Sequence, residues 1–137
     1  MEVSSQAPEF KFIDSIELKN SITYLGENNI LKQSIKKNAS ENLESAKENI
    51  RICRELLKNQ KGLLIVDITL CKEVSIEARM YYSSKEVCNS FYAIALIVNS
   101  PISRVIANFM MGINKIAVPT KVFNNEADAY KWLNKHA

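Results

Sequence analysis

The amino-acid sequence predicts an α/β protein with a single-layer mixed sheet, in which N-terminal antiparallel hairpins lead into a parallel core with helices packed on it. Short segments of β-type residues come first, and helical periodicity begins only near residue 42. Two later runs, 63–68 and 92–98, are apolar on both faces, which is typical of buried parallel strands. Strands that alternate with helices require right-handed crossovers, and hence a parallel portion of the sheet.

The N-terminal part of the chain is expected to form a tail and then antiparallel strands. Residues 1–9 are predicted to be a flexible tail, and residues 10–137 to be a single domain. The segment from Gly26 to Asn29 favours a hairpin, because glycine and asparagine tolerate a positive φ. The strands predicted in this part are 10–13, 15–18, 21–25 and 30–35.

The first helix is predicted over residues 42–58, where apolar residues recur at spacings of three and four. Asn38 or Ser40 is expected to cap it, and Glu41 and Glu44 suit the positive end of its dipole. Its buried face is predicted to comprise Leu43, Ala46, Ile50, Cys53 and Leu57.

The second half of the chain alternates strands and helices. A helix is predicted over 76–90, between the strands at 63–68 and 92–98. The sequence Asn99-Ser100-Pro101 then indicates a helix start, with a polar cap followed by a proline whose missing N–H costs nothing there. One buried stripe is predicted on this helix, made of Ile102, Val105, Ile106, Phe109 and Ile113, with Gly112 as its C-terminal cap.

The chain closes with a strand and a helix. Pro119 lies in the strand predicted over 117–123, which favours a position at the sheet edge because proline cannot donate a ladder hydrogen bond. Asn124 or Asn125 is expected to cap the last helix. The residues of this helix predicted to face inward are Ala127, Tyr130 and Leu133.

Composition excludes several classes of protein. A chain of 137 residues with 47% hydrophobic and 24% charged residues is typical of a soluble globular domain. The formal net charge of +3 is spread along the chain without a basic stripe, so no nucleic-acid partner is predicted. The sequence shows neither a signal peptide nor an apolar run long enough to span a bilayer. A cytoplasmic protein is therefore expected.

Catalytic and metal-binding signatures are missing from the sequence. Cys53, Cys71 and Cys88 are widely separated and odd in number, which favours three small buried hydrophobes over a disulfide framework or a zinc site. His136 is the single histidine, so the commonest general base and metal ligand is absent from nearly the whole chain. Gly-rich phosphate loops and nucleophile elbows are also absent. We predict no enzymatic activity and no cofactor.

Polar residues follow the predicted parallel strands, at the border where partners gather in open α/β sheets. A structural interpretation is that Asp67 accepts N–H bonds in a turn, Ser75 caps a helix and Glu77 complements its dipole. The functional alternative is that Arg79 and Arg104 lie on one rim and attract an anion or an acidic partner surface. The candidate partner-binding residues are Asp67, Thr69, Ser75, Glu77, Arg79 and Arg104.

The order of elements, the strand end 66-VDIT-69 and the tail at 108–133 resemble the STAS-type domain of the anti-anti-sigma factors. This is the SpoIIAA-like fold, and the chain is most similar to the small stand-alone STAS-like proteins of bacteria. The resemblance covers most of residues 10–137. It implies a regulatory protein-interaction domain, and it carries no catalytic motif.

The phosphorylation switch of those factors is not preserved in this sequence. Counting without gaps from Asp67, the resemblance places Glu77 at the family's phosphoserine, Ser75 at its aspartate and Ala78 at its glycine. Three interpretations follow: Ser75 is a displaced phosphosite, Glu77 fixes one state with its permanent charge, or the switching is lost. We favour the last.

Two functional hypotheses follow from the sequence. The first is a STAS-like domain that binds a protein partner through the helix at 75–82 and the adjacent rim. The second is a small-molecule or lipid-binding module, because Phe109, Met110 and Met111 offer more apolar bulk than one helix face needs. A homodimer built on exposed positions such as Tyr81 and Tyr82 is compatible with both.

Overall fold

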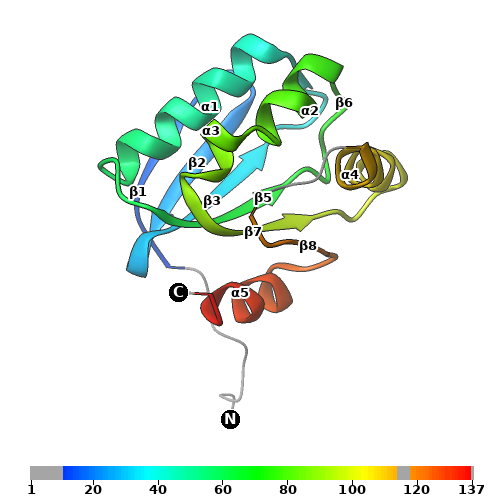
Figure 1. Ribbon diagram of the computed structural model, residues 1–137. Coiled ribbons are helices and arrows are strands. Elements are labelled where there is room, and N and C mark those ends of the chain that lie inside the picture. Colours follow the sequence, from blue (N-terminus) through cyan, green and yellow to red (C-terminus); the bar gives the residue numbers. More distant parts are fainter. Residues whose placement is uncertain (1–10, 114–117, 137) are drawn as a thin grey trace.

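A six-stranded mixed sheet lies at the centre of the molecule, with strand order β1-β2-β3-β5-β7-β8. Helices cover both of its faces in the computed structural model, which describes residues 11–113 and 118–136 (Figure 1). The predicted tail at residues 1–9 lies outside the described residues, as do residues 10 and 117 of two predicted strands. The predicted fold class, with antiparallel strands before a parallel core, is confirmed.

The antiparallel part consists of β1 (Phe12–Glu17), β2 (Ser21–Gly26) and β3 (Ile30–Ile35). The prediction of separate strands at 10–13 and 15–18 is wrong, because β1 is continuous and its pairing with β2 only shifts register near its start. A short 3-10 helix, η1 (Glu27–Asn29), joins β2 to β3. Its turn depends on Asn28 and Asn29, whose φ angles are 61° and 57°.

The parallel part consists of β3, β5 (Gly62–Asp67), β7 (Phe91–Ile97) and β8 (Thr120–Phe123). Its register aligns the ends of these strands, because Asp67 pairs with Ser34 and Ile97, and Ile97 pairs with Phe123. We call this border the carboxyl edge. As Pro119 predicted, β8 is an outermost strand of the sheet.

Two hydrophobic cores lie on opposite faces of the sheet. Helices α1 (Leu43–Leu56), α2 (Ile76–Tyr82) and α3 (Lys85–Cys88) cover one face, and α5 (Glu126–Asn134) covers the other (Figure 1). Neighbouring residues of one strand enter different cores, so Leu64 packs under α1 whereas Leu63 packs with Leu133 of α5. This alternation explains why β5 and β7 are apolar throughout.

The predicted helix at 76–90 is wrong, because the chain forms two short helices there. Ser83 ends α2, and Ser84 has extended backbone angles of φ −70° and ψ 156°. The Ser84 hydroxyl accepts the Val87 N–H at 3.4 Å and thereby caps α3. A serine pair inside an apparently periodic segment was therefore a boundary between helices.

The start of α1 also differs from the prediction. Asn42, instead of Asn38 or Ser40, caps this helix, and it forms a capping box with Ser45. Ser40 belongs to β4 (Ser40–Glu41), which pairs in parallel with β6 (Glu73–Val74) in a small second sheet that the sequence did not predict. This small sheet connects the start of α1 to the start of α2.

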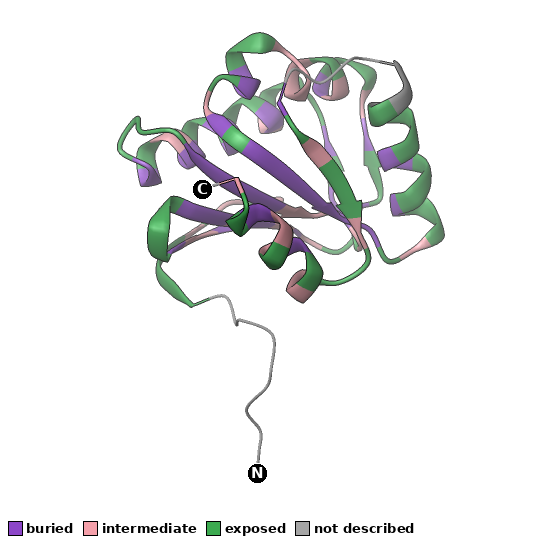
Figure 2. Ribbon diagram, turned by 60° about the horizontal axis from the view of Figure 1, so that its bottom comes forward, coloured by how far each residue is buried: buried purple, intermediate pink, exposed green. Residues whose placement is uncertain are grey.

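Helix α4 (Pro101–Ile113) lies at the carboxyl edge beside β6, and Figure 2 shows much of its surface exposed. The predicted buried stripe is largely wrong, because Ile102, Val105 and Phe109 are 55%, 67% and 37% exposed. Within the predicted stripe Ile106 is buried as predicted, and Ser103 and Ala107 are buried in addition. A helix that contacts the end of a sheet buries only a narrow face, which explains this difference. The prediction that Gly112 caps the C-terminus is wrong, because Gly112 lies inside α4. The side chain of Ile113 lies outside the described residues.

Helix α5 agrees with its prediction in part. Asn125 caps it by accepting the Asp128 N–H at 2.9 Å, and Leu133 is fully buried. Ala127 and Tyr130 are only half-buried, and Ala129 takes the buried position instead.

Candidate functional site

The elbow after β5 is held by the polar residues that the sequence singled out. Asp67 Oδ1 accepts the Thr69 N–H at 3.0 Å, and Ser75 Oγ accepts the Ala78 N–H at 3.1 Å as the N-cap of α2. The structural interpretation of Asp67 and Ser75 is therefore confirmed. The Ser100 hydroxyl donates to the Thr69 carbonyl at 2.9 Å and fixes the start of α4 against the elbow.

Arg79 connects α2 to α4. Its guanidinium carbon lies 4.1 Å from the centre of the Phe109 ring, a distance suited to a cation–π contact. Its Nε is buried and finds no hydrogen-bond acceptor among the described residues. Arg104 is exposed and lies five residues before Phe109, roughly 140° around the helix. The structure thus places Arg79 against α4 and leaves Arg104 on another flank of that helix.

Large apolar side chains remain exposed on α2, on α4 and in the elbow between β5 and β6. Each is between 37% and 67% exposed. Large exposed apolar side chains that gather near one another mark interaction sites in soluble proteins, and the Arg79–Phe109 contact brings α2 and α4 together. Tyr81 and Tyr82, which were expected to be exposed positions for a homodimer, are half-buried, so that expectation is wrong for these two residues. The neighbouring Met80 is 58% exposed. We define the α2–α4 surface as Leu70, Ile76, Met80, Ile102, Val105 and Phe109.

A second group of polar residues is buried beneath α1 and α2. Asn49 Nδ2 donates to Glu41 Oε1 at 2.6 Å, and the Ser21 hydroxyl donates to Asn49 Oδ1 at 2.8 Å. Gln33 Nε2 donates to the Thr23 hydroxyl at 2.8 Å and to the Asn49 carbonyl at 3.5 Å. All five residues are at most 3% exposed, so β2, β3, β4 and α1 share one internal polar network.

Tyr82 joins this network from the last turn of α2. Its hydroxyl donates to Glu41 Oε1 at 2.8 Å and accepts from Asn49 Nδ2 at 2.9 Å. Burial raises the pKa of Tyr82 well above 10.0, and the adjacent Glu41 charge raises it further, so the phenol stays protonated and donates. Burial likewise raises the pKa of Glu41 above 4.5, although the hydrogen bond from Tyr82 opposes that change.

Glu41 holds α2 at both ends. Its backbone carbonyl accepts the N–H of Ser75, the N-cap residue, at 2.9 Å. Its side chain accepts the Tyr82 hydroxyl from the last turn of the same helix. One residue of β4 therefore contacts both ends of α2.

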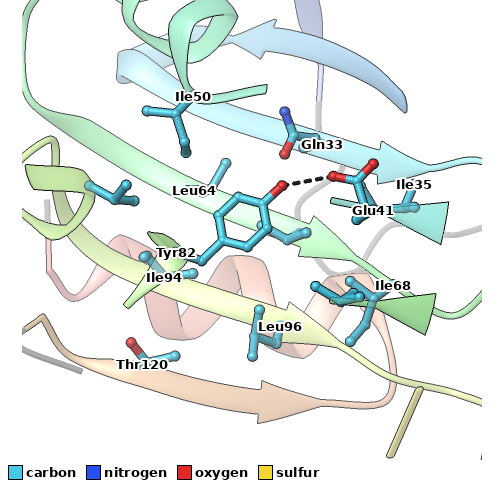
Figure 3. A pocket seen from close by; sticks show the side chains of 13 residues that line it. Gln33, Ile35, Glu41, Ile50, Leu64, Ile68, Tyr82, Ile94, Leu96 and Thr120 are labelled. Atoms are coloured by element: carbon cyan, nitrogen blue, oxygen red, sulfur yellow. Dashed lines mark hydrogen bonds between the residues drawn. The ribbon is translucent and has the colours of Figure 1, made fainter. Parts of the chain in front are cut away.

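Next to the network lies a cavity of about 60 Å³, between the sheet and helices α1, α2 and α3. Figure 3 shows the Tyr82 ring among the lining residues, with its hydroxyl toward Glu41 and Gln33, and aliphatic side chains such as Leu64, Ile94 and Leu96 along the strands. This site was not predicted from the sequence. A signal was present, because Asn49 lies on the apolar face of α1 and Gln33 lies between Leu31 and Ile35 on one face of β3.

The described residues contain no group of three or more His, Cys, Asp and Glu side chains arranged to hold a metal ion. Across residues 11–113 and 118–136, no helix combines the length and the apolar character required to cross a bilayer.

Together the strand order and the helix arrangement define an α/β protein with a SpoIIAA-like fold. An uncharacterized protein of the DUF3478 family with this fold, from Shewanella loihica PV-4, is 16% identical to the chain and superposes with a TM-score of 0.53. The match covers 96% of this chain and 99% of that one. The predicted STAS-like resemblance is thereby confirmed at the level of the fold.

The chain belongs to a family described as a domain of unknown function, DUF7793, whose profile matches residues 24–137. A solved protein of unknown function from Arthrobacter sp. FB24 is 31% identical, over 82% of this chain and 97% of that one, with a TM-score of 0.33. No curated protein matches the chain.

Proposed function

We propose that this chain is a non-enzymatic, cytoplasmic regulatory domain that binds a protein partner through the α2–α4 surface. The observation that carries the proposal is the set of exposed apolar side chains around Arg79. Ile76 and Met80 lie four residues apart on one side of α2, and Phe109 of α4 lies under the Arg79 guanidinium. Large exposed apolar groups next to an arginine are typical of the centre of a protein interface.

The partner we propose presents an apolar segment together with a carboxylate. Arg79 makes no hydrogen bond or ion pair through its guanidinium with the described residues, so its charge is available to a partner carboxylate. Glu77 is exposed in the first turn of α2 and supplies a polar contact at the border of the apolar surface.

We further propose that the phosphoserine switch of the anti-anti-sigma factors is lost in this chain. The Ser75 hydroxyl is half-buried and already accepts the Ala78 N–H. Glu77, at the position corresponding to the family's phosphoserine, carries a permanent charge that no phosphatase removes. The partner interaction would therefore be constitutive or controlled by other means.

A site-specific crosslinking experiment tests the proposed interface. A photo-reactive amino acid is placed at Met80 or, as a control, at Ile13, which is 69% exposed on the distant edge strand β1. The protein crosslinked from Met80 in the native host is identified by mass spectrometry and purified. Its affinity is then measured for the wild type and for the Arg79→Ala, Glu77→Lys and Ile13→Ala variants.

The expected result is that Arg79→Ala weakens binding by about tenfold or more, because interface arginines commonly contribute more than about 1 kcal/mol. Glu77→Lys is expected to weaken it less, and Ile13→Ala not at all. Equal affinities for the wild type, Arg79→Ala and Glu77→Lys would contradict the proposal, provided that circular dichroism shows all three folded.

The internal cavity favours the second hypothesis, a small-molecule-binding module, independently of the α2–α4 surface. The two functions are compatible, because the cavity and the surface use different residues.

A further inference from the structure

The cavity beneath α1, α2 and α3 has a mainly aliphatic lining. The exceptions are Gln33, Glu41, Tyr82 and Thr120. One water molecule needs about 10–15 Å³ by this kind of measure. A cavity of about 60 Å³ therefore has room for roughly four waters or for a molecule of a few non-hydrogen atoms.

The hydrogen-bond donors that line the cavity are already used. The Tyr82 hydroxyl donates to Glu41 Oε1, and the Thr120 hydroxyl donates to the Val118 carbonyl at 2.9 Å. Gln33 Nε2 donates to Thr23, and its contact with the Asn49 carbonyl fixes the orientation of the amide, because a carbonyl can only accept.

Two acceptor atoms of the lining residues have no hydrogen-bond partner in the described part of the chain. The first is Glu41 Oε2, which Figure 3 shows turned away from Tyr82. The second belongs to Gln33. Gln33 is 2% exposed, and its Oε1 accepts no hydrogen bond from any described residue. Figure 3 shows this oxygen on the side of the amide that faces Tyr82, with the nitrogen turned away. Buried polar atoms are nearly always hydrogen-bonded in native proteins, so an unused acceptor facing a cavity calls for a donor from outside the chain.

We propose that the cavity binds a small neutral aliphatic alcohol, whose alkyl chain fills the apolar space and whose hydroxyl donates to Gln33 Oε1. The aliphatic lining accounts for the chain, and the unused acceptor accounts for the hydroxyl. This binding site is separate from the α2–α4 surface and does not depend on the proposed protein partner.

The surroundings of Gln33 disfavour a charged ligand. An ammonium group would lose its hydration against an aliphatic lining. Burial raises the pKa of the nearby Glu41 carboxyl and so disfavours the negative charge that would be needed to balance the ammonium. A carboxylate would lie near Glu41 and compete with it for the same donors, Asn49 and Tyr82. A neutral hydroxyl avoids both penalties.

Methyl-resolved NMR of the full chain tests this proposal with butan-1-ol and 1-chlorobutane, which share the alkyl chain and differ in the hydroxyl. We expect saturable shifts of the cavity methyl groups of Ile94 and Leu64, without comparable shifts of the exposed Ile13 and Ile102. Butan-1-ol should bind about fivefold or more tightly than 1-chlorobutane, because only the alcohol forms the hydrogen bond to Gln33.

Two variants separate the alkyl contact from the hydrogen bond. Leu96→Phe fills the cavity and should abolish the saturable shifts, whereas Ile13→Phe adds the same ring at an exposed site and should leave them unchanged. Gln33→Met removes Oε1 at nearly constant volume and should cancel the preference for the alcohol. Thermal unfolding establishes that each variant is folded.

Several outcomes would overturn the proposal. These are shifts that grow linearly with butan-1-ol without saturation, equal affinity for the alcohol and the chloride, and wild-type binding by folded Leu96→Phe. If Gln33→Met does not fold, the comparison of the two probes on the wild type and the Leu96→Phe result still decide the question.

Discussion

At the scale of single residues, Glu41 is a buried carboxyl that accepts two side-chain hydrogen bonds. It is 3% exposed, and its Oε1 accepts hydrogen bonds from both Asn49 and Tyr82. Burial nevertheless dominates and raises its pKa above 4.5. The folded protein therefore binds the Glu41 proton more tightly than the unfolded chain does.

This raised pKa predicts a pH dependence of stability. The contribution of Glu41 to the free energy of unfolding is fully present below about pH 4.5, where the carboxyl is protonated in both the folded and the unfolded state. This contribution is lost as the pH rises through the pKa of the folded state. Each pKa unit is worth about 1.4 kcal/mol, or a few degrees in melting temperature for a domain of this size. Glu41→Gln should therefore gain melting temperature relative to the wild type between pH 4 and pH 7.

Thermal unfolding followed by circular dichroism at several pH values measures this difference. Glu44→Gln, which changes an exposed carboxylate in the first turn of α1, is the matched control and should show a smaller trend. A melting-temperature difference between Glu41→Gln and the wild type that stays constant from pH 4 to pH 7 would contradict the prediction.

At the scale of elements, the start of β5 depends on a close approach that only glycine permits. A Cβ atom at Gly62 would lie 2.6 Å from the Asn29 carbonyl oxygen and 2.8 Å from Leu57 Cδ2. The first of these atoms belongs to the backbone, so a small side-chain rotation cannot relieve the overlap. Gly62 thus allows η1, the end of α1 and β5 to meet.

We predict that Gly62→Ala lowers the free energy of unfolding by about 1–3 kcal/mol, the usual cost of overpacking a tight site. Chemical denaturation measures this change, with Lys61→Ala, at the exposed neighbouring position, as control. If Gly62→Ala lowers the free energy of unfolding no more than Lys61→Ala does, the prediction is wrong and the backbone shifts at Gly62 without cost.

The sequence predicted elements well wherever one periodicity held over the whole element. α1, β5 and β7 were found because their apolar patterns continue without interruption, and the edge position of β8 followed from Pro119. The division between α2 and α3 was missed because Ser83 and Ser84 interrupt the helix without changing its apolar spacing. The pairing of β4 with β6 joins residues 40 and 73, and local sequence patterns do not predict contacts between residues so far apart in the chain.

The candidate site was predictable only where local chemistry decides it. The roles of Asp67 and Ser75 follow from residues two and three positions away, so the elbow could be read from the sequence. The network of Gln33, Glu41 and Tyr82 draws on three distant elements. The apolar neighbours of Gln33 on β3 indicate that it is buried, but no local pattern links it to Glu41 or Tyr82. The exposure of α4 depends on its position at the sheet end, which apolar spacing does not specify.

At the scale of the whole molecule, the three thiols report on the integrity of the larger core. Cys53, Cys71 and Cys88 are free, at most 3% exposed and all part of that core, as the sequence predicted. Burial raises the pKa of Cys53 to about 12 and that of Cys71 to about 11. The reactive thiolate is therefore scarce at these two sites in the folded protein.

We predict that a thiol reagent such as DTNB at pH 8 labels the native protein at least about a hundredfold more slowly than the denatured chain, which should release three equivalents. Asn59→Cys, at an exposed position after α1, is the control and should add one rapidly reacting equivalent. If one thiol of the native wild-type protein reacts rapidly with DTNB, the prediction is wrong and part of the core opens readily.

The attachment of α2 to Glu41 at both ends has a mechanical consequence. Tyr82 borders the cavity with its ring, while Ile76 and Met80 of the same helix are exposed on the outside. We expect a guest that displaces the Tyr82 ring to shift α2, and a partner bound to the outer side of α2 to oppose that shift. By thermodynamic reciprocity, the ligand in the cavity and the partner on the α2–α4 surface would then each change the affinity of the protein for the other by the same factor.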